Sequence, residues 1–303
     1  MDFRQLRYFV AIVEEGSISA ASRKVHIAQP ALTRQIHALE AALGGSLFER
    51  GAKGIALTVT GKALYEEAKQ LLETRERIMA RITALGQGIT GKVAVGVTVS
   101  HLWVPEIKQV LSGFRDSYPQ VALEVYPLLS GPQSEKLKDG SIDAGFLYMG
   151  DEIPDYLRTR LFHKDNLVLA VPENSPLVDS PPDKVHQLNR YNFVWGPRSS
   201  SPVYYDKLLA YLHQQDFYPK VVQIGADNVT ILSLVAAGLG ISIVPGDCKW
   251  ISPPGVSFID MPELARCDMS VSFAWNTHNH SPALQNFINT VLDGCHTQQP
   301  SSC

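Results

Sequence analysis

Gln29, Thr33 and Arg34 have side chains that suit the recognition of nucleic-acid bases, and their spacing places them on one helical face. The helix that carries them is predicted to begin at Gln29-Pro30, because the first helical turn tolerates a residue without an N–H group. Glutamine and arginine can make paired hydrogen bonds to adenine and guanine edges, and Thr33 can reach a phosphate or a thymine methyl group. We therefore predict that these residues contact DNA, Pro30 included. The alternative is that they are ordinary solvated side chains.

Arg50 and Lys53 lie in a short loop, residues 49–54, between the apolar segments Leu47-Phe48 and 55–57. Apolar segments on both sides of a glycine-containing loop predict a two-stranded hairpin. Basic side chains at its tip would contact DNA phosphates or enter the minor groove. The alternative for Arg50 is that it braces the hairpin.

Three short helices are expected to position this face. The first has an apolar stripe formed by Leu6, Phe9, Val10 and Val13. It should end near Glu15-Gly16, and a second helix over 18–25 has Ser17 or Ser19 available as its N-cap. After a turn at 26–28, the third helix has a predicted buried stripe of Leu32, Ile36, Leu39 and Leu43. With the hairpin, these elements predict a winged helix-turn-helix domain at residues 1–58.

Residues 59–90 predict one long linker helix, running to about Ile89, and a hinge. Its apolar side chains recur with heptad spacing and form a seam of Leu64, Ala68, Leu71, Ile78, Ile82, Leu85 and Ile89. A helix of about 30 residues is ~45 Å long and cannot bury such a seam against a small domain. We therefore expect a dimer, parallel or antiparallel, through Leu64, Leu71, Ile78, Ile82 and Leu85.

The sequence leaves two alternatives for this helix undecided. The helix could instead pack on its own chain. Arg75 occupies the missing heptad position and either fixes the register or points outward.

The charge distribution separates the head from the rest of the chain. Residues 1–62 contain eight Lys/Arg and five Asp/Glu, a balance of +3, whereas the whole chain has a net charge of −3, which leaves −6 for the remainder. A basic head on an acidic body suits a DNA-binding module joined to a second domain. The four cysteines show no pairing rhythm, and no export signal or membrane-spanning run is visible, so a cytoplasmic location is expected, away from the membrane.

From residue 91 onward, short apolar strands alternate with helices, which predicts an α/β architecture built from parallel-strand units. In an open α/β sheet, ligands lie beyond the carboxyl ends of the strands. Candidate ligand-binding residues follow the predicted strands: Thr98, Ser100, His101, Ser130, Tyr148, Arg198, Ser199, Pro202, Val203 and Tyr204.

These candidates combine hydroxyl groups, helix N-termini and one arginine, Arg198, which together favour a small organic anion. Tyr148, Tyr204 and Trp195 suggest that the anion is aromatic. Two alternatives remain. Any single serine here can be a helix cap, and Trp195, like Trp103, is expected to be a core residue rather than a ligand platform.

Motifs for other chemistry are missing from the sequence. No nucleophile elbow, P-loop or dinucleotide-binding glycine motif is present, and no nucleophile–base pair is legible, so we expect neither an enzyme nor a cofactor. His278 and His280 lie in the same C-terminal quarter as Cys295, but their spacing does not fit a metal site.

The chain resembles the LysR-type transcriptional regulators along nearly its whole length. The resemblance rests on three segments: LRYFVAIVEEGSISAASRKVHIAQPALTRQIHALEAALGGSLFERGAKGIALTVTG at 6–61, SIDAGFL at 141–147 and AAGLGISIVP at 236–245. The N-terminal segment is most similar to regulators of aromatic-acid catabolism. Two positions depart from the common pattern, Ala28 where many members have serine and Lys53 where arginine is common.

The resemblance implies a winged head and a linker helix joined to an α/β domain with two lobes, similar to periplasmic solute-binding proteins. It also implies a homotetramer that binds interrupted palindromes in promoter DNA, works with RNA polymerase as an activator, and changes DNA bending when a small molecule enters the cleft between the lobes. Members related to aromatic acids tend to carry arginine near position 148, where this chain has Tyr148.

On this basis the effector-binding domain is predicted at 91–296, with lobe I at about 91–160 and 269–296 and lobe II at about 161–268. Residues 297–303 are predicted to be a disordered tail. A competing hypothesis is a solute-binding protein or an enzyme built on 91–296, with the head incidental. DNA binding with a steep salt dependence, expected only for the regulator, distinguishes the two.

Overall fold

The computed structural model describes residues 1–51 and 54–296, and the chain folds as two compact units, Met1–Ala84 and Leu85 onward. The predicted disordered tail lies outside the described residues, as does Lys53. None of the helices in the described ranges is long and apolar enough to cross a membrane.

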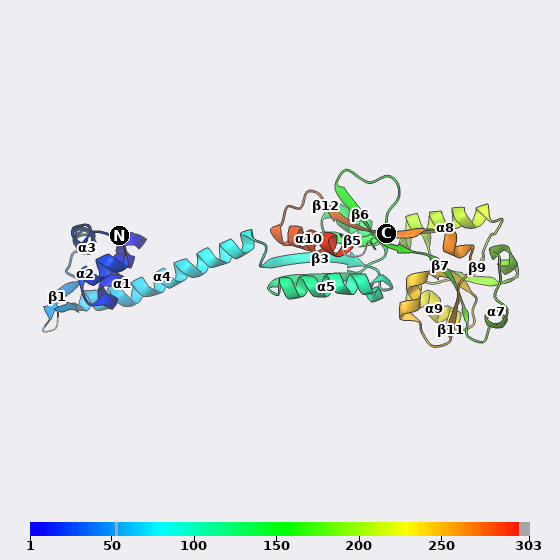
Figure 1. Cartoon of the computed structure of the whole chain (residues 1–303), viewed down its shortest axis with the longest axis horizontal. Helices are drawn as coiled ribbons and strands as arrows, with labels where there is room; N and C mark the ends of the chain where they lie inside the picture. Colours follow the sequence, from blue (N-terminus) through cyan, green and yellow to red (C-terminus); the bar gives the residue numbers. More distant parts are fainter. Residues whose placement is uncertain (52–53, 297–303) are drawn as a thin grey trace, which may run out of the picture. The chain divides into compact units, whose positions relative to one another are not determined.

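The head is a winged helix-turn-helix, as predicted, with helices α1 (Phe3–Glu15), α2 (Ile18–Lys24) and α3 (Gln29–Leu43) (Figure 1). Local chemistry sets these limits. Ser17 Oγ accepts a hydrogen bond from the Ala20 amide at 3.1 Å and caps α2. Gly16, with φ of 67°, provides the left-handed end of α1. The core of the head contains Phe9, Ile12, Leu32, Leu39, Leu47 and Ala68.

The wing is an antiparallel pair, β1 (Phe48–Gly51) and β2 (Gly54–Leu57), with Phe48 opposite Leu57. These strands extend further into the predicted loop than the apolar segments alone indicated. Thr58 Oγ1 then accepts a hydrogen bond from the Gly61 amide at 3.0 Å and caps the next helix.

Helix α4 (Val59–Gly86) is the predicted linker helix, but it ends before Ile89. The first part of the seam belongs to the head, because Ala68 is buried there and Leu64 packs against the same core. The rest of the seam is open, with Leu71, Ile78, Ile82 and Leu85 exposed by 46%, 54%, 61% and 42%. Leu43 is also exposed, so the buried stripe of α3 ends at Leu39.

The first lobe of the regulatory unit contains a five-stranded sheet in the order β4-β3-β5-β12-β6. The strands are β3 (Gly91–Val97), β4 (Val121–Pro127), β5 (Ala144–Tyr148), β6 (Leu157–Asp165) and β12 (Met269–Asn276). β3 is parallel to β4 and β5, whereas β12 is antiparallel to both β5 and β6. The sheet therefore contains the predicted parallel units, β4-β3-β5, and is extended by the antiparallel strands β12 and β6.

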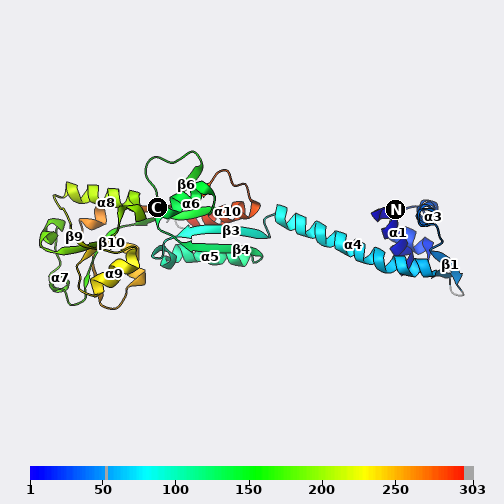
Figure 2. The same ribbon diagram turned by 180° about the vertical axis from the view of Figure 1, so that it is seen from behind.

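Helices cover both faces of this sheet. Helices α5 (Pro105–Ser117) and α10 (Pro282–His296) pack together through Phe114 and Phe287, whose ring centroids are 5.0 Å apart. Figure 2 shows the ribbons of both helices beside the strands of this sheet. Helix α6 (Ser130–Asp139) lies on the other face, where Leu137 joins a separate apolar cluster with Ala94 and Leu147. The helices thus bury the sheet while leaving the ends of β3 and β5 free to carry polar residues.

The second lobe has two small sheets. β7 (Leu167–Pro172) lies between β10 (Ser242–Pro245) and β11 (Val256–Ile259), antiparallel to both, and β8 (Asn192–Trp195) is parallel to β9 (Lys220–Ile224). The helices are α7 (Pro176–Asp179), α8 (Pro202–Gln214) and α9 (Asn228–Ala236). Short 3₁₀ helices occur at His101–Trp103, Val185–Arg190, Arg198–Ser200, Gly246–Ile251 and Leu264–Arg266.

The connection between the lobes differs from the prediction in its position. β6 pairs with β12 as far as Asp165, beyond the predicted end of lobe I at residue 160, and only Asn166 separates it from β7. Trp195 is buried, as expected. Trp103 is 50% exposed instead, with the Lys108 ammonium group 5.1 Å from its ring centroid.

Candidate functional site

The start of α3 presents the predicted DNA-reading residues. Gln29, Pro30 and Arg34 are exposed, and Thr33 is half-buried. Thr33 Oγ1 donates a hydrogen bond to the Gln29 carbonyl at 3.0 Å, which leaves its lone pairs and methyl group for other contacts. Ala28 makes no side-chain cap, so the first amide groups of α3 have no side-chain acceptor from the N-cap.

For the wing, the structure does not describe the two side chains that were predicted to contact DNA. Arg50 belongs to β1, but its side chain, like Lys53, lies outside the described residues. Their predicted phosphate contacts stay predictions.

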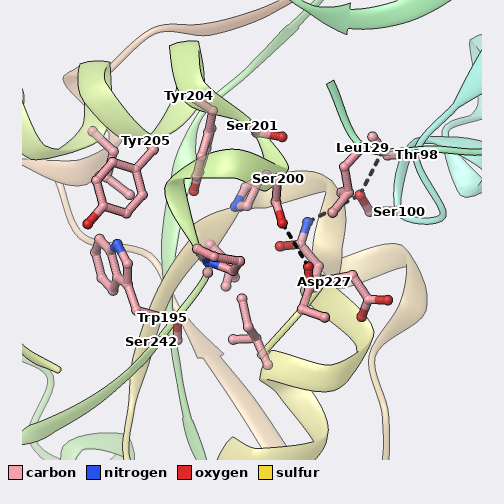
Figure 3. A pocket seen from close by; sticks show the side chains of 18 of the residues that line it. Thr98, Ser100, Leu129, Trp195, Ser200, Ser201, Tyr204, Tyr205, Asp227 and Ser242 are labelled. Atoms are coloured by element: carbon pink, nitrogen blue, oxygen red, sulfur yellow. Dashed lines mark hydrogen bonds between the residues drawn. The ribbon is translucent and has the colours of Figure 1, made fainter. Parts of the chain in front are cut away.

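A cavity in the regulatory unit is formed by residues of both lobes (Figure 3). Its walls combine strand ends of the first lobe with β8, β10 and the starts of α8 and α9 from the second. The lining consists of Thr98, Ser100, Leu129, Tyr148, Trp195, Gly196, Pro197, Ser200, Ser201, Tyr204, Tyr205, Leu208, Ala226, Asp227, Asn228, Ile231, Ser242, Ile243, Val244 and Pro245.

The two lobes approach closely beside this cavity. Asn228 Nδ2 donates a hydrogen bond to Ser100 Oγ across the lobes at 3.3 Å. A Cβ atom on Gly131, at the start of α6, would lie 2.3 Å from the backbone oxygen of Ser199. Only glycine fits there, so Gly131 allows the lobes to meet at this point.

Two helices open at the cavity without side-chain caps, α6 after Leu129 and α8 after Ser201. The amide groups in the first turn of such helices are available to a ligand acceptor, and the helix dipole favours negative charge there. The start of α9 is different, because Asp227 Oδ1 already accepts the Thr230 amide at 2.8 Å. An anion is therefore better placed near α6 and α8 than near α9.

Aromatic rings form much of the remaining wall. Tyr148 and Tyr204 lie with ring centroids 5.1 Å apart. Trp195 and Tyr205 line the same cavity as Tyr204 (Figure 3). Tyr204 Oη is buried and has no hydrogen-bond partner within the described residues. Burial raises the pKa of both tyrosines well above the ordinary value, so each stays a neutral hydroxyl that can donate.

Four of the predicted ligand residues line the cavity, namely Thr98, Ser100, Tyr148 and Tyr204. Two others support Tyr148 from behind. His101 Nε2 lies 3.2 Å from the Tyr148 hydroxyl, and Ser130 Oγ accepts a hydrogen bond from the Tyr148 amide at 3.1 Å. Position after a predicted strand was therefore enough to identify four residues of the cavity lining and two residues that contact Tyr148.

Arg198 does not fit the predicted role. Its guanidinium group donates hydrogen bonds to both carboxylate oxygens of Asp206, at 2.7 and 2.6 Å, on the exposed side of α8. It is not part of the cavity lining, and neither are Ser199, Pro202 and Val203, which lie beside it in the chain. The described lining contains no lysine or arginine, so an ion pair from Arg198 to a bound carboxylate is not supported.

Several lining residues were missed, including Tyr205, Asp227, Asn228 and Ser242. Asp227 and Asn228 follow β9 and begin α9, so the rule that selected Thr98 and Ser130 would also have found them.

A polar cluster lies behind Tyr148. Burial lowers the pKa of His101 to about 4, against the attraction of Asp247. Burial, reinforced by the nearby Asp247 carboxylate, raises the pKa of Asp165 to about 7. Burial alone would lower the pKa of His163, but its hydrogen bond to Asp247 and the surrounding carboxylates raise it overall. The cluster therefore concentrates titratable groups beside the wall of the cavity.

The family comparison agrees with this architecture. Residues 3–62 match the family described as "Bacterial regulatory helix-turn-helix protein, lysR family", and residues 86–296 match the "LysR substrate binding domain". The chain belongs to the LysR family of transcriptional regulators, with a DNA-binding head and an effector-binding domain.

Individual relatives cover the full length of the chain. The transcriptional regulator TfdS of Cupriavidus pinatubonensis is 32% identical, covering 97% of this chain and 99% of that protein, and ClcR of Pseudomonas putida is 33% identical over 96% and 98%. The crystal structure of CbnR, a LysR family transcriptional regulator, is similar with a TM-score of 0.79 at 29% identity, covering 96% and 100%. Full-length CbnR has also been solved with its target DNA, and that chain has a TM-score of 0.79 at 27% identity, covering 97% of this chain and all of its own.

Proposed function

We propose that this LysR-family regulator binds an interrupted palindrome in promoter DNA and responds to a small aromatic anion held between the lobes of its regulatory unit. The observation that carries the proposal is the cavity, whose walls come from both lobes and combine aromatic rings with hydroxyl groups and uncapped helix starts. A ligand that contacts both lobes can favour one arrangement of the lobes over another. Such a shift in population is the physical requirement for a ligand-controlled switch.

The absence of lysine and arginine from the described lining shapes the proposed mode of binding. The ring of the ligand would lie among Tyr148, Trp195 and Tyr204. Its negative group would accept hydrogen bonds from the hydroxyl groups of Ser100 and Ser201 and from first-turn amides of α6 and α8, except at Pro132 and Pro202, which carry no N–H group. Hydrogen bonds to a charged group typically contribute about 1.5–3 kcal/mol, enough to hold a small anion without an ion pair.

The DNA-binding half rests on the exposed start of α3 and on the structure of the relative CbnR with its target DNA. The open seam of α4 supports assembly through that helix, first as a homodimer and then as a homotetramer. An activator that works with RNA polymerase in the cytoplasm is the corresponding cellular role. The relatives named above are transcriptional regulators, which favours this role over an enzyme or a solute-binding protein.

A thermal-shift screen of the full-length protein against aromatic and aliphatic carboxylates tests the ligand class. A ligand at ~100 times its Kd should add about 2.7 kcal/mol to the stability of the regulatory unit. Tyr204→Phe, which removes the unpartnered hydroxyl group, should weaken binding. Tyr126→Phe is the matched control, because its hydroxyl group bonds to Glu124 on the exposed face of β4. Equal shifts for both variants and the wild type would contradict the proposed site.

The DNA-binding half is tested separately by measuring promoter affinity at several salt concentrations. Contact with phosphates predicts a linear fall of log affinity with log salt, with a slope of about −0.9 per neutralised phosphate. An affinity that does not change with salt would exclude the proposed DNA contacts, whatever the ligand screen gives.

A further inference from the structure

A cluster of histidine and carboxylate side chains lies where the two lobes meet, outside the cavity lining. His163 and Asp165 belong to β6 of the first lobe, and Asp247 belongs to the 3₁₀ helix Gly246–Ile251 of the second. One nitrogen or oxygen atom from each of the three residues lies within 4.8 Å of the other two. The closest pair is His163 Nε2 and Asp247 Oδ1, at 3.1 Å.

One carboxylate oxygen in this cluster lacks a partner. Asp247 is only 5% exposed, and its Oδ2 atom makes no hydrogen bond within the described part of the chain. His101 Nε2 lies 3.9 Å from this oxygen, which is too far for a hydrogen bond. A buried carboxylate oxygen without a donor is costly unless a cation or a further donor compensates it.

The backbone brings the second carboxylate close to the first. The Asp247 amide donates a hydrogen bond to Asp165 Oδ2 at 3.2 Å. Gly246 leaves room for this approach, because a Cβ atom there would lie 2.8 Å from Asp165 Oδ1 and 2.4 Å from Asn166 Oδ1 and would displace these side chains. Two carboxylates held side by side with an imidazole nitrogen form a donor set of one nitrogen ligand and two carboxylate oxygen ligands.

We propose that His163, Asp165 and Asp247 bind a divalent transition-metal ion that links the two lobes of the regulatory unit. Imidazole and carboxylate ligands suit Zn²⁺ and neighbouring first-row ions, and two carboxylates supply the negative charge that a divalent ion needs. Ligand atoms at about 2.0–2.2 Å from one ion are roughly 3.0–3.5 Å apart, which agrees with the separation of His163 Nε2 and Asp247 Oδ1. Water would complete the coordination.

The site is connected to the cavity through His101. Its Nε2 atom faces both Asp247 Oδ2, at 3.9 Å, and the hydroxyl group of the cavity residue Tyr148, at 3.2 Å. An ion that fixes Asp247 would therefore also restrict Tyr148. This coupling to ligand binding rests on the proposed function of the cavity, whereas metal binding itself does not.

Metal binding is measured on the chelator-treated full-length protein, without any small-molecule ligand. Zn²⁺ competition with a chromophoric chelator should give one strong site per chain, and Co²⁺ should give a d–d spectrum of nitrogen and oxygen ligands without a thiolate charge-transfer band. His163→Gln and Asp247→Asn should each weaken Zn²⁺ binding at least 10-fold. The double variant His278→Gln/His280→Gln should bind like the wild type, because those histidines lie outside the cluster.

The proposal is overturned if the wild type binds no Zn²⁺ at micromolar concentrations, because His163 and Asp247 would then form only a hydrogen-bonded pair. It is also overturned if His163→Gln, shown by circular dichroism to be folded, binds as tightly as the wild type. Loss of binding in the His278→Gln/His280→Gln variant, or a thiolate band with Co²⁺, would place the ion elsewhere. Metal binding without any effect on the carboxylate screen would leave this site intact and count only against its coupling to the cavity.

Discussion

The predicted DNA-reading residues on α3 lie at the start of that single helix, whereas the lining of the regulatory cavity is drawn from positions between Thr98 and Pro245. In the head, Gln29, Pro30 and Arg34 are exposed, Thr33 is half-buried, and their positions follow from helical spacing. In the cavity, strand ends and helix starts from two lobes meet, and buried hydroxyl groups and a buried histidine support the wall. Substitutions in the head should therefore act locally, whereas substitutions in the regulatory unit should act through the contact between its lobes.

The head and the regulatory unit should differ most in how their stability responds to acidification. The pKa of His101 is about 4 in the folded protein against 6.5 when unfolded, because the ring is buried between Tyr148, Asp247 and His163. The unfolded chain therefore binds more protons at that ring, and stability is lost as pH falls through 6.5 towards 4, by up to about 3 kcal/mol.

The raised pKa values of Asp165 and His163 act in the opposite direction, because the folded state binds more protons at those groups. The prediction therefore concerns the contribution of His101: in chelator-treated protein, going from pH 7 to pH 5 should change the unfolding temperature of the regulatory unit less favourably in the wild type than in His101→Gln, while the transition of the head changes less. The groups with shifted pKa in the described part of the head, Asp2 and Lys24, lie at the surface, where solvent screens their interactions. Calorimetry with His101→Gln as comparison measures the effect. An equal pH dependence in that variant would assign the transition to other groups.

Arg34→Ala should weaken DNA binding by the head without affecting the regulatory unit. Loss of one base contact predicts a decrease in promoter affinity of about 2 kcal/mol, or roughly 30-fold, with an unchanged fold and unchanged thermal shifts for cavity ligands. Fluorescence anisotropy with promoter DNA measures it. Arg115→Ala is the matched control, because Arg115 pairs with its neighbour Asp116 on α5. A promoter affinity like that of the control would remove Arg34 from the reading face.

Gly131→Ala tests the contact between the lobes. The new methyl group would meet the Ser199 carbonyl, so the lobes must separate at the cavity, at a cost of about 1–2 kcal/mol. Ligand affinity should fall roughly 10-fold while the promoter affinity without ligand stays the same, as measured by calorimetry and anisotropy. Gly113→Ala on α5, where a methyl group meets nothing within 4 Å, should leave both unchanged. Unaltered ligand affinity in Gly131→Ala would show that the cavity tolerates open lobes.

The smallest expected effect is a gain in stability. Ala28 is the N-cap of α3 but makes no cap, so Ala28→Ser should stabilise the head by about 1 kcal/mol without altering the regulatory unit. The thermal midpoint of the head transition measures this gain. A decrease would show that the backbone at residue 28 does not suit a serine cap.

Sequence reasoning was most successful where the chemistry is local. The helix limits at Ser17, Gly16 and Gln29 follow from capping residues and proline, and the structure confirms them. β6 was missed because it lies at the edge of its sheet and carries charged residues, as in Arg158 and Arg160, instead of a continuous apolar run. Such a strand can be identified only from its pairing with β12, which is far away in the sequence.

The errors in the cavity have the same origin. Arg198 was assigned to a ligand because its type and position suit a carboxylate, but Asp206 satisfies it from the next helix. Trp103 was expected in the core, yet the 3₁₀ turn that precedes α5 holds it at the surface. In both cases the deciding neighbour is set by tertiary structure rather than by spacing in the sequence.

The single residue between β6 and β7, Asn166, limits how the two lobes can move. A linker this short cannot let one lobe slide along the other, since only a few backbone dihedral angles are available to change. The chain crosses back between the 3₁₀ helix Leu264–Arg266 and β12, so opening and closing of the cavity should be a rotation about an axis through these two short crossings, on the microsecond-to-millisecond scale of hinge motions. The backbone amide of Asn166, which donates to Asp165 Oδ1 at 2.8 Å, would report that rotation directly in relaxation-dispersion NMR.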